Sequence, residues 1–146
     1  MKFALAMVYY AVKGLEQVHS FGYSHSDLKM GNICARVGSD GKLKFTLIDF
    51  GVVTKLTKIG QLIDMDKKLF RGNLMTSSLD HILSHRSSVL DDIYSLLCVA
   101  FQFVFVKLPW EEAFDEILAK SKGKLTQQEY QVFYIKMRMK HAEEFD

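Results

Sequence analysis

Apolar residues recur with a helical period in three parts of this chain. One stretch of apolar positions spaced by three and four residues predicts an amphipathic helix over about Phe3–His19. A second, strongly apolar helix is predicted over about Leu90–Val106 and is ended by Leu108–Trp110, which contains the single proline. The remaining part, Glu111–Ala142, is also predicted to be helical, with an interruption near Ser121–Lys124.

Between the first two helices the pattern changes to that of strands and loops. Two short strands are predicted at Ile33–Val37 and Lys42–Ile48, joined by the turn-forming cluster Gly38–Gly41. The loop Ser24–Asn32 precedes this hairpin, and a long, mostly polar segment with basic residues, Val52–Thr76, follows it. The predicted fold is α+β, mostly α, with a small β-hairpin beside a loop, in one domain covering residues 1–146.

Composition narrows the class of protein only modestly. With 49% hydrophobic and 25% charged residues, the chain is expected to be globular, and its net charge of +2 does not indicate a nucleic-acid partner. The longest apolar run, Leu96–Val106, is too short to cross a bilayer, and we interpret it as part of a buried core helix with no membrane partner. Because Cys34 and Cys98 stand alone, we expect an intracellular protein, cytoplasmic or nuclear, without structural zinc.

Two motifs carry the candidate chemistry. His25–Asn32 reads H-x-D-L-x-x-x-N, and Asp49–Gly51 reads D-F-G after the second predicted strand. Phosphoryl transfer needs a carboxylate near the attacking hydroxyl, a cation near the phosphate, and oxygen ligands for Mg²⁺. In this order the two motifs match the catalytic loop and the metal-binding loop of protein kinases.

The chain resembles the C-terminal lobe of a eukaryotic protein kinase, and within that superfamily it is most similar to casein kinase I and the vaccinia-related kinases. Beyond the two motifs, Gly72–Asp80, Asp91–Leu96 and Leu108–Trp110 resemble the corresponding casein kinase I passages. Glu144 and Phe145 also lie where that family has a similar Ser-Glu-Phe, so the resemblance covers essentially the whole chain.

The resemblance implies a role for each candidate site residue. Asp27 is expected to be the catalytic carboxylate, and Lys29 to contact the γ-phosphate of ATP, as in serine/threonine kinases. Asn32 and Asp49 are expected to bind Mg²⁺, and Cys34 to lie at the floor of the adenine pocket. The implied cofactors are therefore ATP and Mg²⁺, and the implied substrates are proteins phosphorylated on Ser or Thr.

Several other polar residues are expected to be structural. Asp92 is expected to anchor the catalytic loop from the N-terminus of the apolar helix, whereas Asp91 is expected to be solvated. His25 is expected to pack and form hydrogen bonds in the core. The hydroxyls of 76–78 are interpreted as surface groups or backbone hydrogen-bonding partners rather than phosphorylation sites. A metal role for His81 and His85 is disfavoured, because no Glu stands at position 82.

The sequence also departs from the kinase pattern. Ser26 replaces the Arg that usually precedes the catalytic Asp, so switching through a phosphate paired with that Arg is expected to be absent. Val89 and Leu90 stand where casein kinase I has a basic pair, which weakens any inference about its substrate preference. The chain begins at the helix before the catalytic loop, so the N-terminal lobe is expected to be absent, and with it the Gly-rich loop and the strand Lys.

Three interpretations remain open from the sequence. In the first, the chain supplies the catalytic and metal-binding loops of a Ser/Thr kinase but not the roof of the nucleotide site. In the second, it is an inactive kinase-like fragment that binds a protein partner covering the exposed cleft. In the third, it is an unproductive fragment that folds poorly.

Overall fold

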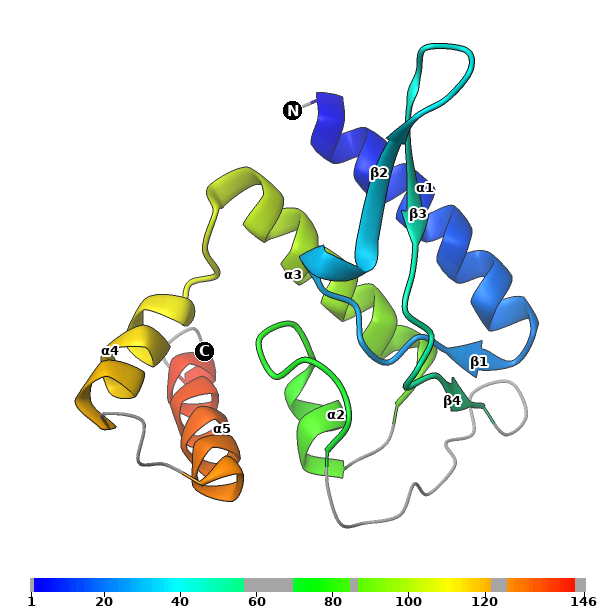
Figure 1. Ribbon diagram of the computed structural model, residues 1–146. Coiled ribbons are helices and arrows are strands. Elements are labelled where there is room, and N and C mark those ends of the chain that lie inside the picture. The colour runs from blue at the N-terminus through cyan, green and yellow to red at the C-terminus, as the bar shows by residue number, and fades with distance from the viewer. Residues whose placement is uncertain (1, 57–69, 85–86, 122–125, 144–146) are drawn as a thin grey trace. The chain divides into compact units, whose positions relative to one another are not determined.

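The computed structural model of the chain describes residues 2–56, 70–84, 87–121 and 126–143 (Figure 1). It forms two compact units, Met1–Val106 and Lys107–Asp146, which we call unit 1 and unit 2. The predicted class is confirmed, since the described residues are mostly helical and also form small antiparallel sheets.

Unit 1 contains three helices, a single 3₁₀ turn and four short strands within the described residues. In chain order these are α1 (Lys2–Ser20), β1 (Tyr23–Ser24), η1 (Met30–Asn32), β2 (Ile33–Val37), β3 (Leu43–Leu47), β4 (Thr54–Lys55), α2 (Leu79–Ser84) and α3 (Val89–Phe105). Most of the predicted polar segment after β4 lies outside the described residues.

The predicted hairpin is confirmed. β2 and β3 pair antiparallel, with Ile33 opposite Leu47 and Val37 opposite Leu43. Gly41 in the connecting turn has φ +71°, a left-handed conformation that glycine adopts without steric strain. A second antiparallel pair, β1 with β4, was predicted as loop, because two-residue strands are too short to show an alternating pattern.

The core of unit 1 lies between α1, the β2–β3 hairpin and α3. Its buried members come from α1, β3, α3 and the loop after β1: Met7, Ala11, Leu15, Leu28, Phe45, Leu47, Leu96 and Val99. The helix and the hairpin approach closely at Gly14, where an added Cβ would lie 2.9 Å from Leu47 Cδ1. A larger side chain at Gly14 would therefore force the Leu47 side chain out of its place in the core.

Helix α3 is only partly the buried core helix that its composition predicted. Leu96 and Val99 contribute to the core, whereas Leu97 is 64% exposed and Phe105 is 63% exposed. An apolar run of this length therefore has one packed face and one face that unit 1 itself does not cover.

The prediction that Asp91 is solvated is wrong. The hydroxyl of Ser88 caps α3 by accepting from Asp91 N, and the Asp91 carboxylate accepts from Ser88 N at 2.8 Å and from Ser88 Oγ at 2.6 Å. This is a capping box, with Asp in the place of the usual Glu or Gln. Asp91 also accepts from the hydroxyl of Ser78, so the carboxylate is satisfied and only 7% exposed.

Unit 2 consists of α4 (Glu111–Ser121) and α5 (Gln127–Glu143), which confirms the predicted helical region. The Phe114 ring lies edge-on to Tyr130 at 4.9 Å and to Tyr134 at 5.1 Å, and the Arg138 guanidinium stacks over Trp110 at 4.3 Å. Across the described ranges, no helix is long and apolar enough to cross a membrane.

Candidate functional site

Asp27 lies in the loop between β1 and η1, and its side chain is only 10% exposed. Its Oδ2 accepts from Lys29 Nζ at 2.7 Å and from Asn32 Nδ2 at 3.1 Å. Asn32 Nδ2 also donates to the backbone oxygen of Asp27 at 2.8 Å, which fixes the turn between the two residues. The other carboxylate oxygen, Oδ1, is buried and receives no donor from the described part of the chain.

The backbone of this loop is held by the side chain of Asp92, near the start of α3. The Asp92 carboxylate accepts from His25 N at 2.8 Å and from Ser26 N at 2.9 Å, and it pairs with His19 Nε2 at 2.8 Å. Asp92 is 1% exposed, so its charge is compensated by these donors and by the helix N-terminus. The predicted anchoring role of Asp92 is confirmed, whereas the contribution of His19, the one His of α1, had no sequence signal.

Asp49 lies two residues after the end of β3, and a backbone hydrogen bond brings its segment next to this loop. Ile48 N donates to Asn32 O at 3.0 Å, which places the segment carrying Asp49 beside Asn32. Asp49 is exposed and has φ +62°, a left-handed conformation that Asp tolerates better than most residues. Its Oδ1 accepts from Gly51 N at 3.3 Å, so the carboxylate turns back over its own D-F-G loop.

His25 and Phe50 connect the two loops through their side chains. His25 is fully buried, as predicted, and its Nε2 lies 3.2 Å from Ile48 O. Its ring also lies 5.0 Å from the ring of Phe50. These contacts hold the Asp27 loop and the Asp49 loop against one another independently of any ligand.

The oxygen atoms of the site suit a hard divalent cation. Asn32 uses its Nδ2 for hydrogen bonds, so its Oδ1 remains an acceptor. Asp49 adds an exposed carboxylate one residue after Ile48, whose N–H donates to the backbone oxygen of Asn32. Mg²⁺ prefers such oxygens and is commonly held by one or two carboxylates together with substrate phosphates. Among the described residues, no three or more His, Cys, Asp or Glu side chains form a cluster that could hold a metal. A Mg²⁺ site that is completed by substrate phosphates does not need such a cluster.

The remaining predicted positions are more scattered. Cys34 is exposed on β2, opposite Thr46, and its predicted place at the floor of an adenine pocket remains a prediction. The His81 ring packs against Phe70 at 5.0 Å, whereas His85 lies outside the described residues.

The segment before α2 packs directly on the Asp27 loop. Thr76 Oγ1 donates to Leu28 O, and a Cβ built on Gly72 would lie 2.6 Å from Ser26 O. Thr76 is 1% exposed and Ser77 is 2% exposed, so the surface-hydroxyl interpretation is wrong for both, while backbone hydrogen bonding holds for Thr76. Any peptide reaching Asp27 Oδ1 would therefore meet a loop already in contact with this segment.

Sequence analysis also missed a buried group of four hydroxyls beside Asp27. The members, which we call the hydroxyl cluster, are Ser24, Ser26, Thr54 and Ser87. Ser24 and Thr54 are cross-strand partners in the β1–β4 pair, whereas Ser87 lies just before α3. Only the tertiary structure brings them together, so no local pattern could have found them.

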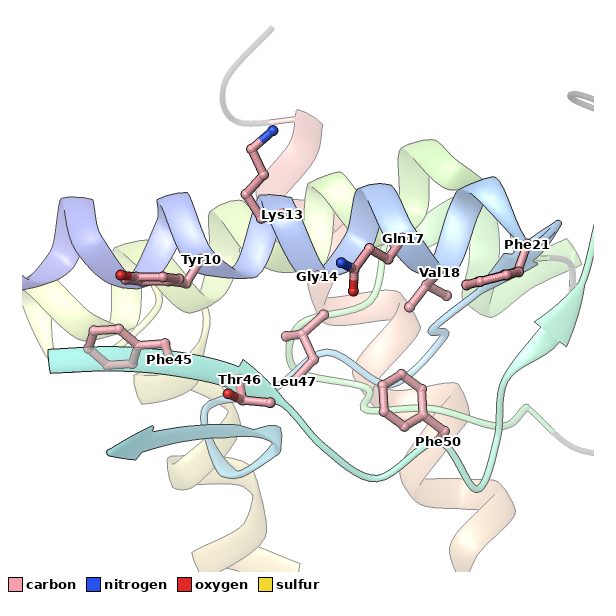
Figure 2. A pocket seen from close by; sticks show the side chains of 10 residues that line it. All are labelled: Tyr10, Lys13, Gly14, Gln17, Val18, Phe21, Phe45, Thr46, Leu47 and Phe50. Carbon is pink, nitrogen blue, oxygen red and sulfur yellow. The ribbon is translucent and has the colours of Figure 1, made fainter. Parts of the chain in front are cut away.

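An apolar groove lies beside these loops, between α1 and β3. Figure 2 shows Tyr10 and Val18 of α1 facing Phe45, Leu47 and Phe50 across a cavity of about 380 Å³. A second cavity of about 330 Å³ continues it and shares Phe50 with it. We call the combined surface the α1 groove.

Comparison with known proteins decides the family. The pattern of the protein kinase domain matches residues 2–145. The chain belongs to the protein kinase family. This kinase chain is 33% identical over 106 residues to the casein kinase 1-like protein HD16 of Oryza sativa subsp. japonica, a match covering 69% of the chain and 15% of that relative.

Two further relatives support the same family assignment. A putative casein kinase I of Caenorhabditis elegans is 30% identical over 106 residues, covering 71% of the chain and 31% of the relative. A probable serine/threonine-protein kinase of fowlpox virus is 31% identical over 103 residues, covering 66% of the chain and 33% of the relative. The predicted resemblance to casein kinase I is therefore confirmed at the level of distant similarity, and the matched region spans about a third or less of these relatives.

Proposed function

We propose that this chain supplies the catalytic and metal-binding loops of a casein kinase I-like serine/threonine kinase, which transfers the γ-phosphoryl group of Mg-ATP to Ser or Thr of intracellular proteins. In this proposal the chain forms the C-terminal lobe of the kinase domain, and the roof of the nucleotide site comes from other residues. The observation that carries the proposal is the buried Oδ1 of Asp27, which has no donor among the described residues.

A buried carboxylate oxygen without a donor favours a ligand that can donate a hydrogen bond. A substrate hydroxyl would satisfy Oδ1, while Lys29 and Asn32 keep Oδ2 occupied and fix the rotation of the carboxylate. Asp27 would then accept the hydroxyl proton as the oxygen attacks phosphorus. Lys29, with its side chain 38% exposed, would contact the transferring phosphate.

The fit of Mg-ATP rests on Asn32 and Asp49. When bound, Mg²⁺ neutralises the charge on the phosphate oxygens and orients the transferring group. Asn32 Oδ1 and the Asp49 carboxylate would hold that ion, since their segments are joined by the Ile48 to Asn32 backbone hydrogen bond. Cys34 would lie under the adenine ring, two residues beyond Asn32 on β2.

The direct test is phosphotransfer by a fusion that places the nucleotide-binding lobe of a casein kinase I relative before this chain, with casein as the acceptor. We expect Asp27→Asn to lower kcat by a factor of about 10² to 10⁴, the usual range for a positioned acid-base group. Asp49→Asn is expected to raise the Mg²⁺ concentration needed for half-maximal rate. Asp80→Asn, at an exposed aspartate in α2, is the matched control and is expected to leave both values unchanged.

The outcome that rejects the proposal is equally direct. If Asp27→Asn retains the full rate, Asp27 takes no part in catalysis. If the fusion neither transfers phosphate nor gains thermal stability with Mg-ATP, the chain does not form a nucleotide site.

A second candidate function, protein binding without catalysis, is favoured by the α1 groove. Phe21 is 78% exposed and Phe50 is 47% exposed at its wall, and contiguous exposed apolar surface commonly marks a binding site. On this hypothesis, sedimentation of the isolated chain would show a concentration-dependent complex that Phe21→Ser disrupts. A monomer at all concentrations, together with a nucleotide-induced rise in melting temperature, would contradict it.

A further inference from the structure

We propose that the hydroxyl cluster positions the catalytic loop for phosphoryl transfer, with Ser26, Thr54 and Ser87 acting as positioning residues for Asp27. This inference rests on the proposed function, because it assigns those residues to the same reaction. Thr54 and Ser87 lie outside both kinase motifs, and Ser26 occupies the variable position of H-x-D, so none of the three is a motif-defining residue.

The cluster is a closed network of short contacts. Ser26 Oγ lies 3.0 Å from Thr54 Oγ1 and 2.8 Å from Ser87 Oγ, and Ser24 Oγ lies 2.7 Å from Ser87 Oγ. Ser26 Oγ also lies 3.3 Å from Ser24 Oγ. A hydroxyl can donate once and accept twice, so four of them can satisfy one another without water.

Because the four hydroxyls are buried, the loss of any one of them is expected to be costly. All four side chains are between 0% and 5% exposed, so a member that lost its partner would have no solvent to replace it. Three separate parts of the fold meet here: the β1 strand with the residue before Asp27, the β4 strand, and the residue two positions before α3. The network therefore fixes these parts relative to one another.

The position of Ser26 explains why this matters for Asp27. Ser26 precedes Asp27 directly and has φ +66°, a left-handed conformation that most residues other than glycine avoid. Its N–H is held by Asp92, and its side chain is held by Thr54 and Ser87. Backbone and side chain together keep this conformation, and with it the direction in which the Asp27 carboxylate leaves the chain.

The cluster also links the two loops that carry the proposed chemistry. Thr54 lies five residues after Asp49, at the end of the D-F-G loop, and pairs with Ser24 across the β1–β4 ladder. The contact between Ser26 and Thr54 therefore fixes the position of the Asp27 loop relative to the Asp49 loop. Because phosphoryl transfer depends on positioning, a shift of one loop against the other is expected to slow the reaction.

The experiment uses the same active fusion, with substitutions that remove one hydroxyl each. Thr54→Val keeps the shape of the side chain and deletes the hydroxyl, Thr54→Ser restores a hydroxyl, and Ser87→Ala removes another member. Ser39→Ala, at an exposed turn residue, is the matched control. We expect Thr54→Val and Ser87→Ala each to lower kcat about tenfold, the scale of a small misplacement, with KM for ATP changed less than about twofold.

Two further readouts separate positioning from general stability. Thr54→Ser is expected to recover most of the lost kcat, and the Thr54→Val/Ser87→Ala double variant is expected to lose little more than either single one, because both act on one network. Hydrogen exchange of the Ser26 amide is expected to accelerate in Thr54→Val, while amides in α5 are unaffected. If Thr54→Val does not fold, Ser87→Ala carries the test alone, since it removes only one oxygen atom.

The results that overturn the inference are distinct from those that overturn the kinase assignment. If Thr54→Val and Ser87→Ala keep kcat within about twofold while Asp27→Asn abolishes it, the cluster has no positioning role and the proposed function stands. A fall in apparent kcat that equals the fraction of protein lost from the folded state, with the rate per folded molecule unchanged, would also overturn it. If Asp27→Asn itself is fully active, the proposed function fails first.

Discussion

Removing the Asp92 carboxylate tests how the loop that carries Asp27 is held. Asp92 accepts from His25 N, Ser26 N and His19 Nε2, at distances between 2.8 and 2.9 Å. The two backbone donors are fully or almost fully buried, whereas the His19 side chain is 15% exposed and can turn to water. The energetic consequence therefore comes mainly from the two backbone N–H groups.

The magnitude follows from what each substitution leaves unpaired. Asp92→Ala strands two buried N–H groups at about 1–3 kcal/mol each, so we expect a loss of about 4 kcal/mol in the free energy of unfolding. Asp92→Asn can keep its carbonyl oxygen where Oδ2 lies, which preserves the bond from His25 N but turns the amide NH₂ toward Ser26 N. One charge-assisted hydrogen bond is then lost, at about 1.5–3 kcal/mol.

The assay is urea unfolding of the chain followed by far-ultraviolet circular dichroism, with Asp80→Asn as the control for loss of an exposed negative charge. We expect wild type to be the most stable, Asp92→Asn to be less stable and Asp92→Ala to be the least stable. The control is expected to lie within about 0.5 kcal/mol of wild type. Hydrogen exchange should place the largest change at the amides of His25 and Ser26. If Asp92→Ala costs less than about 1 kcal/mol, or if those two amides stay protected, Asp92 does not hold the loop.

Three other substitutions test separate features of the fold. Gly72→Ala would place a Cβ 2.6 Å from Ser26 O at a residue with φ +138°, so urea unfolding should show a loss of about 2–4 kcal/mol. Val106 has φ +72°, unfavourable for a β-branched residue, so Val106→Gly should raise stability by about 1 kcal/mol in thermal melts, and an unchanged melting temperature would refute the strain. The backbone N–H of Thr126 and, to a smaller extent, its hydroxyl hold the pKa of Glu129 below its ordinary value. This contact therefore stabilises the folded state fully at pH values above the ordinary pKa of Glu. Its contribution is lost as pH falls through the lowered pKa, and Glu129→Gln should flatten that acid-side decrease in urea titrations between about pH 6 and pH 3.

The elements with a long apolar period could be predicted closely from the sequence. The first helix was expected at Phe3–His19 and extends over Lys2–Ser20, and the strand Ile33–Val37 has the predicted ends. The apolar helix was expected at Leu90–Val106 and extends over Val89–Phe105. These elements are determined by local side-chain periodicity, which a sequence displays directly.

The features that the sequence did not reveal depend on contacts between distant segments. The β1–β4 pair joins Ser24 to Thr54 through two-residue strands that have no periodicity of their own. Asp91 was expected in solvent, yet it accepts from Ser78 and from Ser88. The contact with Ser88 is a local capping box, which the Ser-x-x-Asp spacing could have indicated. The prediction that Asp27 and Asn32 share one tight loop is confirmed by their hydrogen bond, whereas their roles in catalysis and metal binding stay predictions.

The hydroxyl cluster has a consequence for the response of the site to ionic strength. Its four members carry no formal charge, so dissolved salt has no ion pair there to screen. By contrast, the pair formed by Lys29 and Asp27 is partly open to water and weakens as electrolyte is added. Concentrated salt would therefore weaken the contact between Lys29 and the Asp27 carboxylate while leaving the hydroxyl cluster unchanged.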